Sequence, residues 1–277
     1  MEIKITTLSE NTANYGYLAE WGLSILVEVD EATILVDTGL SFSAMHNAQL
    51  MGIDLATIDC IVLSHGHADH TGGLRDVLKI RREVKVVAHP DIWIPKYVRR
   101  EGEPQEQHNG MPFTREELES HGARFNLARE PVHIAEHILT TGEIPMLLDY
   151  EEIENNLFVK EAGMLRPDPL ADDLALIIDT DFGLVVVLGC AHRGMISTLR
   201  HAQNLTGKEL PPSKSSFRLV REGRRERSLI WLYRRSSWVR LGREGSRERS
   251  LIPFLSKPIL VRLRREASGE RSHIGLI

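Results

Sequence analysis

The sequence predicts an α/β fold in which the ends of strands carry the chemistry. Two short apolar runs, at residues 60–63 and 184–188, have the length and composition of buried strands. Each run is followed by a polar loop and then by a segment with a helical pattern, at residues 74–82 and 194–204. Open α/β sheets place reactive groups beyond the carboxyl ends of their strands, so these two loops are where we look for function.

The loop after the first run has the sequence SHGHADHTGG at residues 64–73, and it holds four metal-capable side chains within six positions. Imidazole and carboxylate are good ligands for a borderline dication such as zinc. One loop cannot aim all four groups at a single ion without strain. We therefore expect His65 and His67 to hold one ion, and Asp69 and His70 to reach a second. Two ions roughly 3.5–4 Å apart can share a water and lower its pKa. The alternative, a solvated loop that contains three histidines by chance, fits this spacing poorly.

This motif resembles the signature of the metallo-β-lactamase fold superfamily of metallohydrolases. Four further segments agree with it in order: ILVDTG at 34–39, TTGEIP at 140–145, DDLAL at 172–176 and LGCAH at 188–192. Together they resemble the subgroup of 7,8-dihydropterin-6-methyl-4-(β-D-ribofuranosyl)aminobenzene-5'-phosphate synthase-like hydrolases. The resemblance covers residues 1–207. It implies an αββα sandwich, with two mixed sheets face to face and helices outside, whose second half is truncated.

The segments before the histidine motif predict strands and one helix. Apolar runs at residues 22–29 and 33–37, separated by an acidic turn, predict a hairpin. Residues 41–51 predict a helix that Ser41 or Ser43 caps and that a glycine ends.

Two predicted strands end in single polar residues that could belong to the site. Asp37 is either a plain turn former or, as the resemblance implies, a catalytic-site residue that supports the metal ligands from behind. Residues 84–90 predict a strand that ends at His89. We favour a capped or solvated histidine there over one that lies beside the substrate. At residues 91–133 the resemblance implies a substrate-facing insertion.

The second half of the chain delivers another group of candidates. Residues 174–179 and 184–188 predict a hairpin that ends in the sequence GCAH. A histidine in this place can be a structural group, but the resemblance supports His192 as the fifth metal ligand. Asp173 and Cys190 are weaker candidates. The resemblance puts Cys190 where many superfamily members have a bridging aspartate.

The resemblance stops after residue 207. Relatives continue with a strand and a Gly-Gly-x-His-Leu motif, whose histidine is the last metal ligand, and this motif is absent here. Residues 213–277 instead hold 17 Lys and Arg against 6 Asp and Glu, a formal charge of +11, whereas residues 1–212 carry −16. The triplets Arg-Glu-Gly and Glu-Arg-Ser recur in this tail at a period of 22 residues.

Three interpretations of the tail stay open. A repeat of 22 residues could form a solenoid, although each copy offers little apolar surface. Arginines interleaved with Trp231, Tyr233 and Trp238 could form a nucleic-acid-binding arm. We favour a translated DNA repeat that replaced the authentic C-terminus by insertion or frameshift. The expected organisation is a metallo-β-lactamase domain at residues 1–207 and a basic, disordered or non-native tail at 208–277.

Composition limits the remaining classes. The chain has 277 residues, enough for one large domain or two small ones. Its two cysteines, Cys60 and Cys190, lie in apolar runs without framework spacing, which fits a reducing cytosol. We see no basic-then-apolar leader, and no apolar run approaches the ~20 residues needed to span a bilayer. We expect a cytoplasmic protein with a small-molecule substrate and no membrane partner. We do not favour a nucleic-acid partner, and the oligomeric state stays open.

These features predict a metal-dependent hydrolase that uses a zinc-activated hydroxide on an ester, lactone or phosphodiester. By the resemblance, His65, His67 and His192 hold the first ion. Asp69 and His70 hold the second ion, and Asp69 also steers a proton. One or two zinc ions are expected, because the last ligand of the second ion is missing. The alternatives are a truncated, catalytically impaired pseudoenzyme and nucleic-acid binding through the tail.

Overall fold

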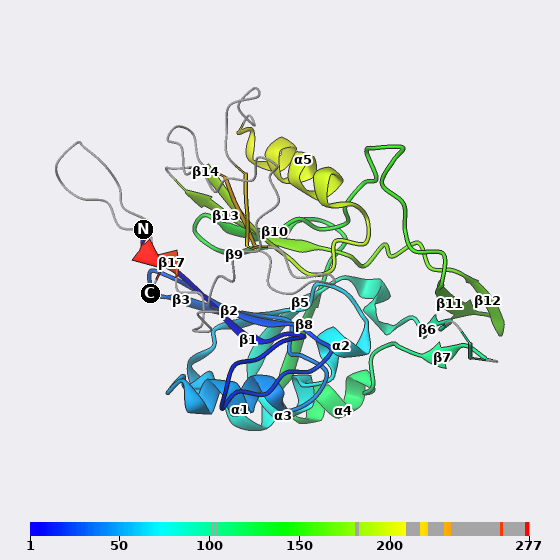
Figure 1. The fold of residues 1–277 in the computed structure, drawn as a ribbon, viewed down its shortest axis with the longest axis horizontal. Coiled ribbons are helices and arrows are strands. Elements are labelled where there is room, and N and C mark those ends of the chain that lie inside the picture. The colour runs from blue at the N-terminus through cyan, green and yellow to red at the C-terminus, as the bar shows by residue number, and fades with distance from the viewer. Residues whose placement is uncertain are drawn as a thin grey trace, which may run out of the picture.

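The computed structural model describes residues 1–208, apart from positions 101, 104, 181 and 182, together with four short strands beyond residue 208. Two six-stranded sheets lie face to face, and helices cover their outer faces (Figure 1). The first sheet is covered by α1 (Ser43–Leu50), α3 (Leu74–Arg81) and α4 (Arg115–Ser120), and the second by α5 (Met195–Thr206). This is the αββα sandwich that the sequence predicted.

The first sheet combines an antiparallel half with a parallel half. Its strand order is β1-β2-β3-β4-β5-β8. The first three strands pair antiparallel, whereas β3, β4, β5 and β8 pair in parallel. The strands are β1 (Ile3–Ser9), β2 (Ser24–Val29), β3 (Ala32–Val36), β4 (Cys60–Val62), β5 (Val84–Ala88) and β8 (Ala123–Leu127). The parallel half brings the ends of β3, β4 and β5 to one edge of the sandwich, because parallel strands end on the same side.

The second sheet is antiparallel, with the order β15-β16-β14-β13-β10-β9. The predicted hairpin is present as β13 (Ala175–Thr180) and β14 (Gly183–Leu188). On the other side of β13 lie β10 (Ile138–Thr140) and β9 (His133–Ala135). Two tail strands, β16 (Ile230–Tyr233) and β15 (Phe217–Val220), extend the sheet beyond β14. The sheet therefore continues past the point where the resemblance to relatives ends.

Most of the tail that we assigned to residues 208–277 lies outside the described residues. The segment expected to be disordered or non-native, and the possible nucleic-acid-binding arm, therefore lie largely outside the described residues. Besides β15 and β16, only the short pair β17 (Val261–Arg262) and β18 (Gly275–Leu276) is described there.

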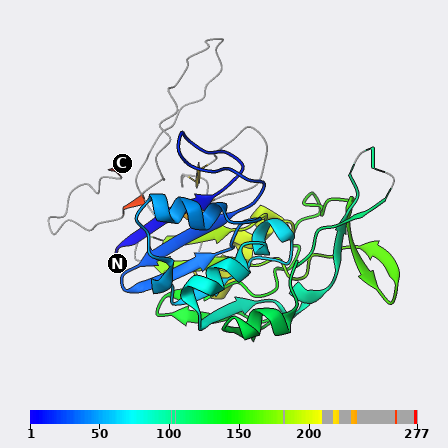
Figure 2. The ribbon, with the colours of Figure 1, turned by 90° about the horizontal axis from the view of Figure 1, so that it is seen from below.

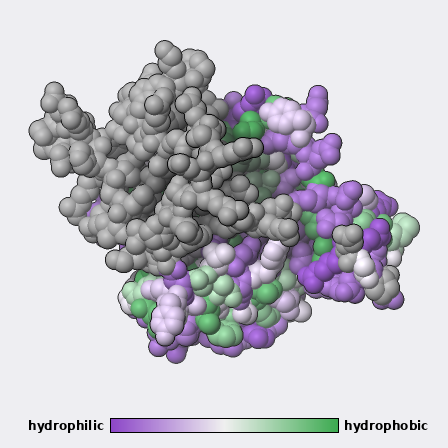
Figure 3. Space-filling view, in the orientation of Figure 1, coloured by the Kyte–Doolittle hydropathy of each residue, from purple (hydrophilic) through white to green (hydrophobic). Residues whose placement is uncertain are grey.

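A third, four-stranded sheet projects from one end of the sandwich (Figures 1 and 2). Its strands are β12 (Met164–Pro167), β11 (Leu157–Glu161), β6 (Lys96–Val98) and β7 (Gln107–His108). Hydrophilic side chains dominate the part of this sheet that is visible in the space-filling view (Figure 3). Two of its strands come from the stretch 91–133 that was predicted to face the substrate.

The core explains why the second apolar run of the sequence is continuous. Along β14, Val185 and Val187 pack into the layer between the two sheets. The alternate residues Leu184, Val186 and Leu188 pack into the layer beneath α5. Successive side chains of a strand point to opposite faces, so a strand with two covered faces is apolar throughout.

Among the described residues, no helix has the length and apolar character that crossing a membrane requires.

The start of α1 differs from the prediction. Phe42 occupies the N-cap position, and no side chain caps the helix. The hydroxyl of Ser43 lies 2.5 Å from that of Ser9, and the hydroxyl of Ser41 donates to Glu20 at 2.5 Å. Both hydroxyls are thus bonded to β1 and the loop after it. Tertiary contacts have replaced the local cap that the sequence pattern favours.

Residues 64–73, which we call the histidine loop, pack backbone to backbone against the segment after β3. A Cβ atom at Gly72 would lie 2.0 Å from the carbonyl oxygen of Leu40, and one at Gly73 would lie 2.1 Å from that of Thr38. Both glycines have ordinary negative φ, so close approach rather than backbone conformation requires them. This contact seats the short helix α2 (Ala68–Thr71) and the start of α3 against the end of β3.

Replacing Gly72 by Ala should destabilise the fold by about 3 kcal/mol, because the new methyl group overlaps a backbone oxygen that cannot move alone. Gly52 is the matched control: it has φ 69° but no neighbour within 4 Å of an added Cβ. Gly52→Ala should cost only the left-handed backbone penalty, about 1–2 kcal/mol. Urea unfolding of both variants measures the difference, and equal losses would contradict the close-contact argument.

Candidate metal centre

Asp37 connects the end of β3 to the histidine loop. Its carboxylate accepts a hydrogen bond from the backbone N–H of Ser64 at 2.7 Å and another from the Ser64 hydroxyl at 2.7 Å. The same carboxylate lies 2.6 Å from Nδ1 of His70, and both side chains are buried. These contacts fix the beginning of the loop and turn Nε2 of His70 toward the centre of the site. Asp37 therefore contacts the histidine loop and one candidate ligand, His70, from behind.

Four imidazole rings converge next to this support. The ring centroid of His65 lies 4.6 Å from that of His67, 4.2 Å from that of His70 and 4.9 Å from that of His192. Nε2 of His65 is 2.9 Å from Nδ1 of His67. The rings come from the histidine loop and from the end of β14, so the structure brings together histidines that are more than a hundred positions apart in the sequence.

His192 is positioned by a carboxylate that no sequence pattern indicated. Its Nδ1 lies 2.8 Å from Oε2 of Glu154, in the segment before β11. Its Nε2 is buried and makes no hydrogen bond to a nitrogen or oxygen atom of the described residues. A histidine whose one nitrogen meets a carboxylate while the other points into a cluster of donors has the arrangement typical of a metal ligand.

Cys190 lies beside the histidine cluster, although the sequence made it only a weaker candidate for the site. Its Sγ atom is 3.0 Å from Nε2 of His70. Oδ2 of Asp69 lies 3.6 Å from the same nitrogen. The ligand atoms of His65, Cys190 and His192 all lie within 4.8 Å of one another. The donor set therefore contains imidazole, carboxylate and thiol groups, which together suit zinc better than magnesium or calcium.

Burial and mutual charge shift the pKa values of this cluster in opposite directions. Burial, together with the other histidines, lowers the pKa of His65 well below its usual value. Burial also opposes protonation of His70 and His192, but nearby negative charge outweighs it. Cys190 is the largest single source of that charge, and the pKa of His70 rises well above its usual value while that of His192 rises to about 10. For Cys190, burial raises the pKa, and the two histidines more than offset this and lower it. A dication bound here would compete with protons for these groups.

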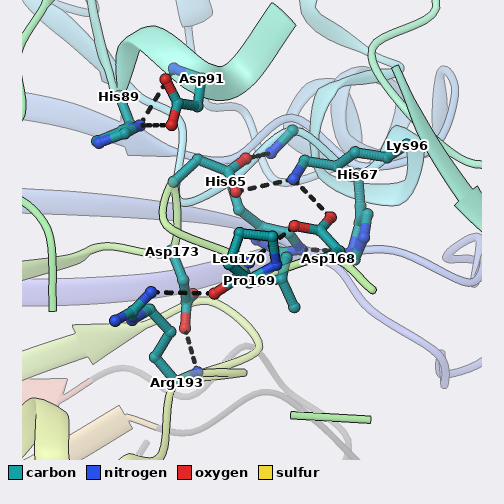
Figure 4. A network of polar contacts seen from close by, with 12 residues as sticks. His65, His67, His89, Asp91, Lys96, Asp168, Pro169, Leu170, Asp173 and Arg193 are labelled. Carbon is teal, nitrogen blue, oxygen red and sulfur yellow. Dashed lines mark hydrogen bonds and ion pairs between the residues drawn. The ribbon is translucent and has the colours of Figure 1, made fainter. Parts of the chain in front are cut away.

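A buried ion-pair network holds the histidine loop from the side of the third sheet (Figure 4). Nζ of Lys96, on β6, lies 2.8 Å from Asp168 and 2.9 Å from Oδ1 of Asp172. Oδ2 of Asp172 accepts a hydrogen bond from the backbone N–H of Gly66 at 2.8 Å. Gly66 stands between His65 and His67, so the network fixes the backbone that carries these two candidate ligands. Neither Lys96 nor Asp168 was selected from the sequence.

Asp173 supports the loop after β14, and its carboxyl interacts electrostatically with His192 and His70. Its Oδ2 accepts a hydrogen bond from the backbone N–H of Arg193 at 2.9 Å, directly after His192. Burial raises the pKa of Asp173 to about 6. The buried carboxyl thus anchors the chain beyond β14, and Figure 4 shows it beside Arg193.

His89 lies in a separate polar cluster. Its Nδ1 accepts a hydrogen bond from the backbone N–H of Asp91 at 3.1 Å. Its Nε2 lies 3.4 Å from Arg129 and 3.6 Å from Glu143. The ring is buried at the end of β5, where it caps the turn that follows, and it does not line the cavity described next.

A cavity of about 570 Å³ opens above the cluster. One side is formed by the candidate ligands His67, Asp69, His70, Cys190 and His192. The remaining lining residues come from the loop after β1, the segment after β3 and the third sheet: Asn11, Trp21, Gly22, Leu23, Leu40, Val98, Arg100, Asn109, Asn156 and Leu157. A small molecule placed here would lie directly against the metal-capable groups.

A family model described as the metallo-beta-lactamase superfamily matches residues 22–213. Because this match spans more than half of the chain, the chain belongs to the metallo-beta-lactamase superfamily. The superfamily that the motifs suggested is thereby confirmed.

Relatives place the chain more narrowly. It is 34% identical over 221 residues to 7,8-dihydropterin-6-methyl-4-(beta-D-ribofuranosyl)-aminobenzene-5'-phosphate synthase of Methanocaldococcus jannaschii, covering 74% of this chain and 73% of the relative. It is 30% identical over 218 residues to an uncharacterized protein of the same organism, covering 78% and 79%. The solved structure of Tm1679, described as a metal-dependent hydrolase of the beta-lactamase superfamily, has a TM-score of 0.61 at 27% identity, covering 75% of this chain and 72% of that one.

Removing the cation of the buried network should unfold the chain far more readily than removing an exposed one. Lys96→Met leaves two buried carboxylates unpaired, so we expect a loss of about 3–5 kcal/mol in the free energy of unfolding. Lys79, whose ammonium lies 2.7 Å from Asp76 at the surface, is the control. Lys79→Met should cost no more than about 0.5 kcal/mol. Urea unfolding compares the two, and similar losses would show that the network does not hold the loop.

Proposed function

We propose that this chain is a metal-dependent hydrolase whose substrate is a small-molecule ester, lactone or phosphodiester. The observation that carries the proposal is the convergence of five metal-capable side chains on one side of a 570 Å³ cavity. The domain responsible is residues 1–207. Because Cys60 and Cys190 are both free thiols, we further propose a reducing, cytoplasmic setting.

The residues proposed to hold the first ion are His65, His67 and His192. The fit rests on the buried Nε2 of His192, which lacks a hydrogen-bonding nitrogen or oxygen among the described residues, and on the 2.9 Å approach of Nε2 of His65 to Nδ1 of His67. Asp69 and His70 are proposed to hold a second ion beside it. Bound zinc would supply Lewis acidity, which lowers the pKa of a water and stabilises negative charge on the substrate.

The chain's own groups would position and protonate the reactants. Asp69 is 15% exposed at the edge of the cavity, so its free carboxylate oxygen can take the proton that an attacking water releases. Asp37 and the Lys96 network keep His70 and Gly66 in place during the reaction. Preorganised groups of this kind do not need to reorient when charge develops.

The far side of the cavity favours an anionic substrate, which among the three classes is the phosphodiester. The guanidinium of Arg100 is exposed and forms no ion pair with any described residue. The amides of Asn109 and Asn156 line the cavity with it and can donate hydrogen bonds, whereas Trp21 offers an aromatic face. The archaeal relative is named as a synthase and Tm1679 as a hydrolase. Hydrolysis is the reaction that we propose here.

A second candidate is a catalytically impaired relative that holds one ion or none. The absence of the Gly-Gly-x-His-Leu motif after residue 207 favours it, because the second ion then lacks the histidine that relatives supply. Metal content separates the two candidates.

We expect about two zinc ions per chain, measured by plasma mass spectrometry on protein purified without chelator, and hydrolysis of bis(p-nitrophenyl) phosphate, a p-nitrophenyl ester or a lactone. The double variant His65→Ala/His67→Ala should lose both metal and turnover. His133→Ala, which changes an exposed histidine on β9, should change neither. One zinc or less, without turnover, would support the impaired relative. Two zinc ions without turnover of any of the three substrates would refute hydrolysis.

Charge recognition by Arg100 should appear as a substrate-specific fall in kcat/KM. Arg100→Gln removes a charge-assisted hydrogen bond worth about 1.5–3 kcal/mol, so kcat/KM for the phosphodiester should fall roughly 10- to 100-fold. The neutral ester with the same leaving group should be affected little. Arg124→Gln is the control. Arg124 lies on β8, pairs with Glu83 and does not line the cavity. An equal loss for both substrates would count against anion recognition.

A further inference from the structure

The cavity above the candidate ligands has walls of different chemical character. The third sheet and the segments beside its strands contribute a guanidinium and two amides, those of Arg100, Asn109 and Asn156. The loop after β1 and the segment after β3 contribute Trp21 and Leu40. Trp21 is 60% exposed and Leu40 is 42% exposed. Two large apolar side chains therefore stay open to solvent in the same cavity as the metal-capable groups.

Glu20 fixes the backbone on one side of Trp21. Its Oε1 accepts hydrogen bonds from the backbone N–H of Leu40 at 2.8 Å and from that of Ser41 at 3.1 Å. Its Oε2 accepts another from the hydroxyl of Ser41. One carboxylate therefore joins the loop after β1 to the segment after β3, and it brings together the residues that carry the two exposed apolar side chains.

Gly22 fixes the backbone on the other side of Trp21. A Cβ atom at Gly22 would lie 2.6 Å from the carbonyl oxygen of Asp69 and 2.8 Å from the backbone nitrogen of Leu40. The next residue, Leu23, donates its N–H to the same carbonyl oxygen of Asp69 at 3.1 Å. Main-chain contacts thus seat the backbone that carries the indole directly against the histidine loop.

Leu40 is held between the same two parts of the chain. Glu20 binds its N–H, and its carbonyl oxygen is the atom that leaves no room for a Cβ at Gly72. Burial of Trp21 and Leu40 in the core would have stabilised the fold, since removing apolar surface from water is favourable. The fold instead fixes their backbone and leaves both side chains open to the cavity. This arrangement fits a surface that an apolar part of a ligand covers.

We propose that Trp21 is a specificity-determining residue, whose indole stacks on a flat aromatic group of the substrate while Leu40 borders that group. Aromatic rings attract one another in offset-stacked or edge-to-face arrangements and bury a large apolar area. The inference rests on the proposed function, because the ligand is the substrate of the metal centre. It narrows the substrate to an ester or phosphodiester that carries an aromatic group, with its anionic part toward Arg100.

Calorimetric titration of the zinc-loaded full chain with phenylphosphonate and with methylphosphonate tests this proposal. The two probes share their anionic head and differ in the aromatic ring. We expect the wild type to bind phenylphosphonate about tenfold more tightly, which is within the range for an aromatic ring that stacks on an aromatic side chain. Trp21→Ala should remove this preference by weakening phenylphosphonate alone, and Trp21→Phe should keep most of it.

Phe42→Ala is the matched control. Phe42 is also 60% exposed and lies two residues after Leu40, but it does not line the cavity. Its removal should leave the Kd of both probes unchanged. Arg100→Gln should weaken both phosphonates by the same factor, because it acts on the anionic head that they share.

The outcomes separate this inference from the proposed function. Equal binding of the two phosphonates by the wild type would overturn the role of Trp21 and leave the proposed metal centre standing. A preference that survives Trp21→Ala, or that Phe42→Ala abolishes, would also overturn it. If the wild type binds neither phosphonate, the proposed recognition of an anionic substrate fails, and this inference fails with it.

A measurement on the wild type alone covers the case in which Trp21→Ala does not fold. Hydroxyl-radical oxidation of the native protein is followed by mass spectrometry of the peptides that contain Trp21 and Phe42. Saturating phenylphosphonate should lower the oxidation of Trp21 several-fold relative to saturating methylphosphonate, whereas the oxidation of Phe42 should not change. Equal oxidation of Trp21 with both probes would overturn the proposal.

Discussion

The buried carboxylate of Asp37 is the contact on which the arrangement of the site depends. It holds the backbone and hydroxyl of Ser64 and Nδ1 of His70 at once, so it fixes both the exit of the histidine loop from β4 and the orientation of one candidate ligand. Asp37 itself adopts φ 57°, a backbone conformation that is uncommon outside glycine. A change of this backbone conformation would break the three contacts of the Asp37 side chain, so these contacts stabilise it.

The centre exists only where the two sheets meet. The first sheet supplies the histidine loop, and the second supplies Cys190 and His192 from the end of β14. The backbone N–H of Leu174 donates to the carbonyl oxygen of Ser64 at 2.9 Å, and this bond joins the two halves directly beside the site. The Lys96 ion pairs tie the third sheet to the same loop. Each half of the sandwich therefore positions side chains that can form a metal centre only together with those of the other half.

The charges in the cluster explain why its groups belong together. A thiol whose pKa is lowered by two histidines, and histidines whose pKa values are raised by that thiol, stabilise one another inside a buried site. A divalent ion would replace the protons in this arrangement and satisfy the same negative charge. The chain belongs to the metallo-beta-lactamase superfamily, and the solved structure of Tm1679, which it resembles, is described as that of a metal-dependent hydrolase.

The sequence by itself determined the class of fold and the local part of the site. The apolar runs of β4 and β14 predicted buried strands, and the spacing of His65, His67, Asp69 and His70 predicted a metal centre, because both signals are contained within a few consecutive residues. The tertiary structure decided which distant groups support them. Glu154 meets His192 across 38 positions, and Lys96 meets Asp168 and Asp172 across 72 and 76. It also brought Cys190 to His70 across 120 positions and took the hydroxyl of Ser43 from its helix to Ser9. Such pairs leave no periodic pattern in the sequence, since only the packing of the two sheets brings their elements together.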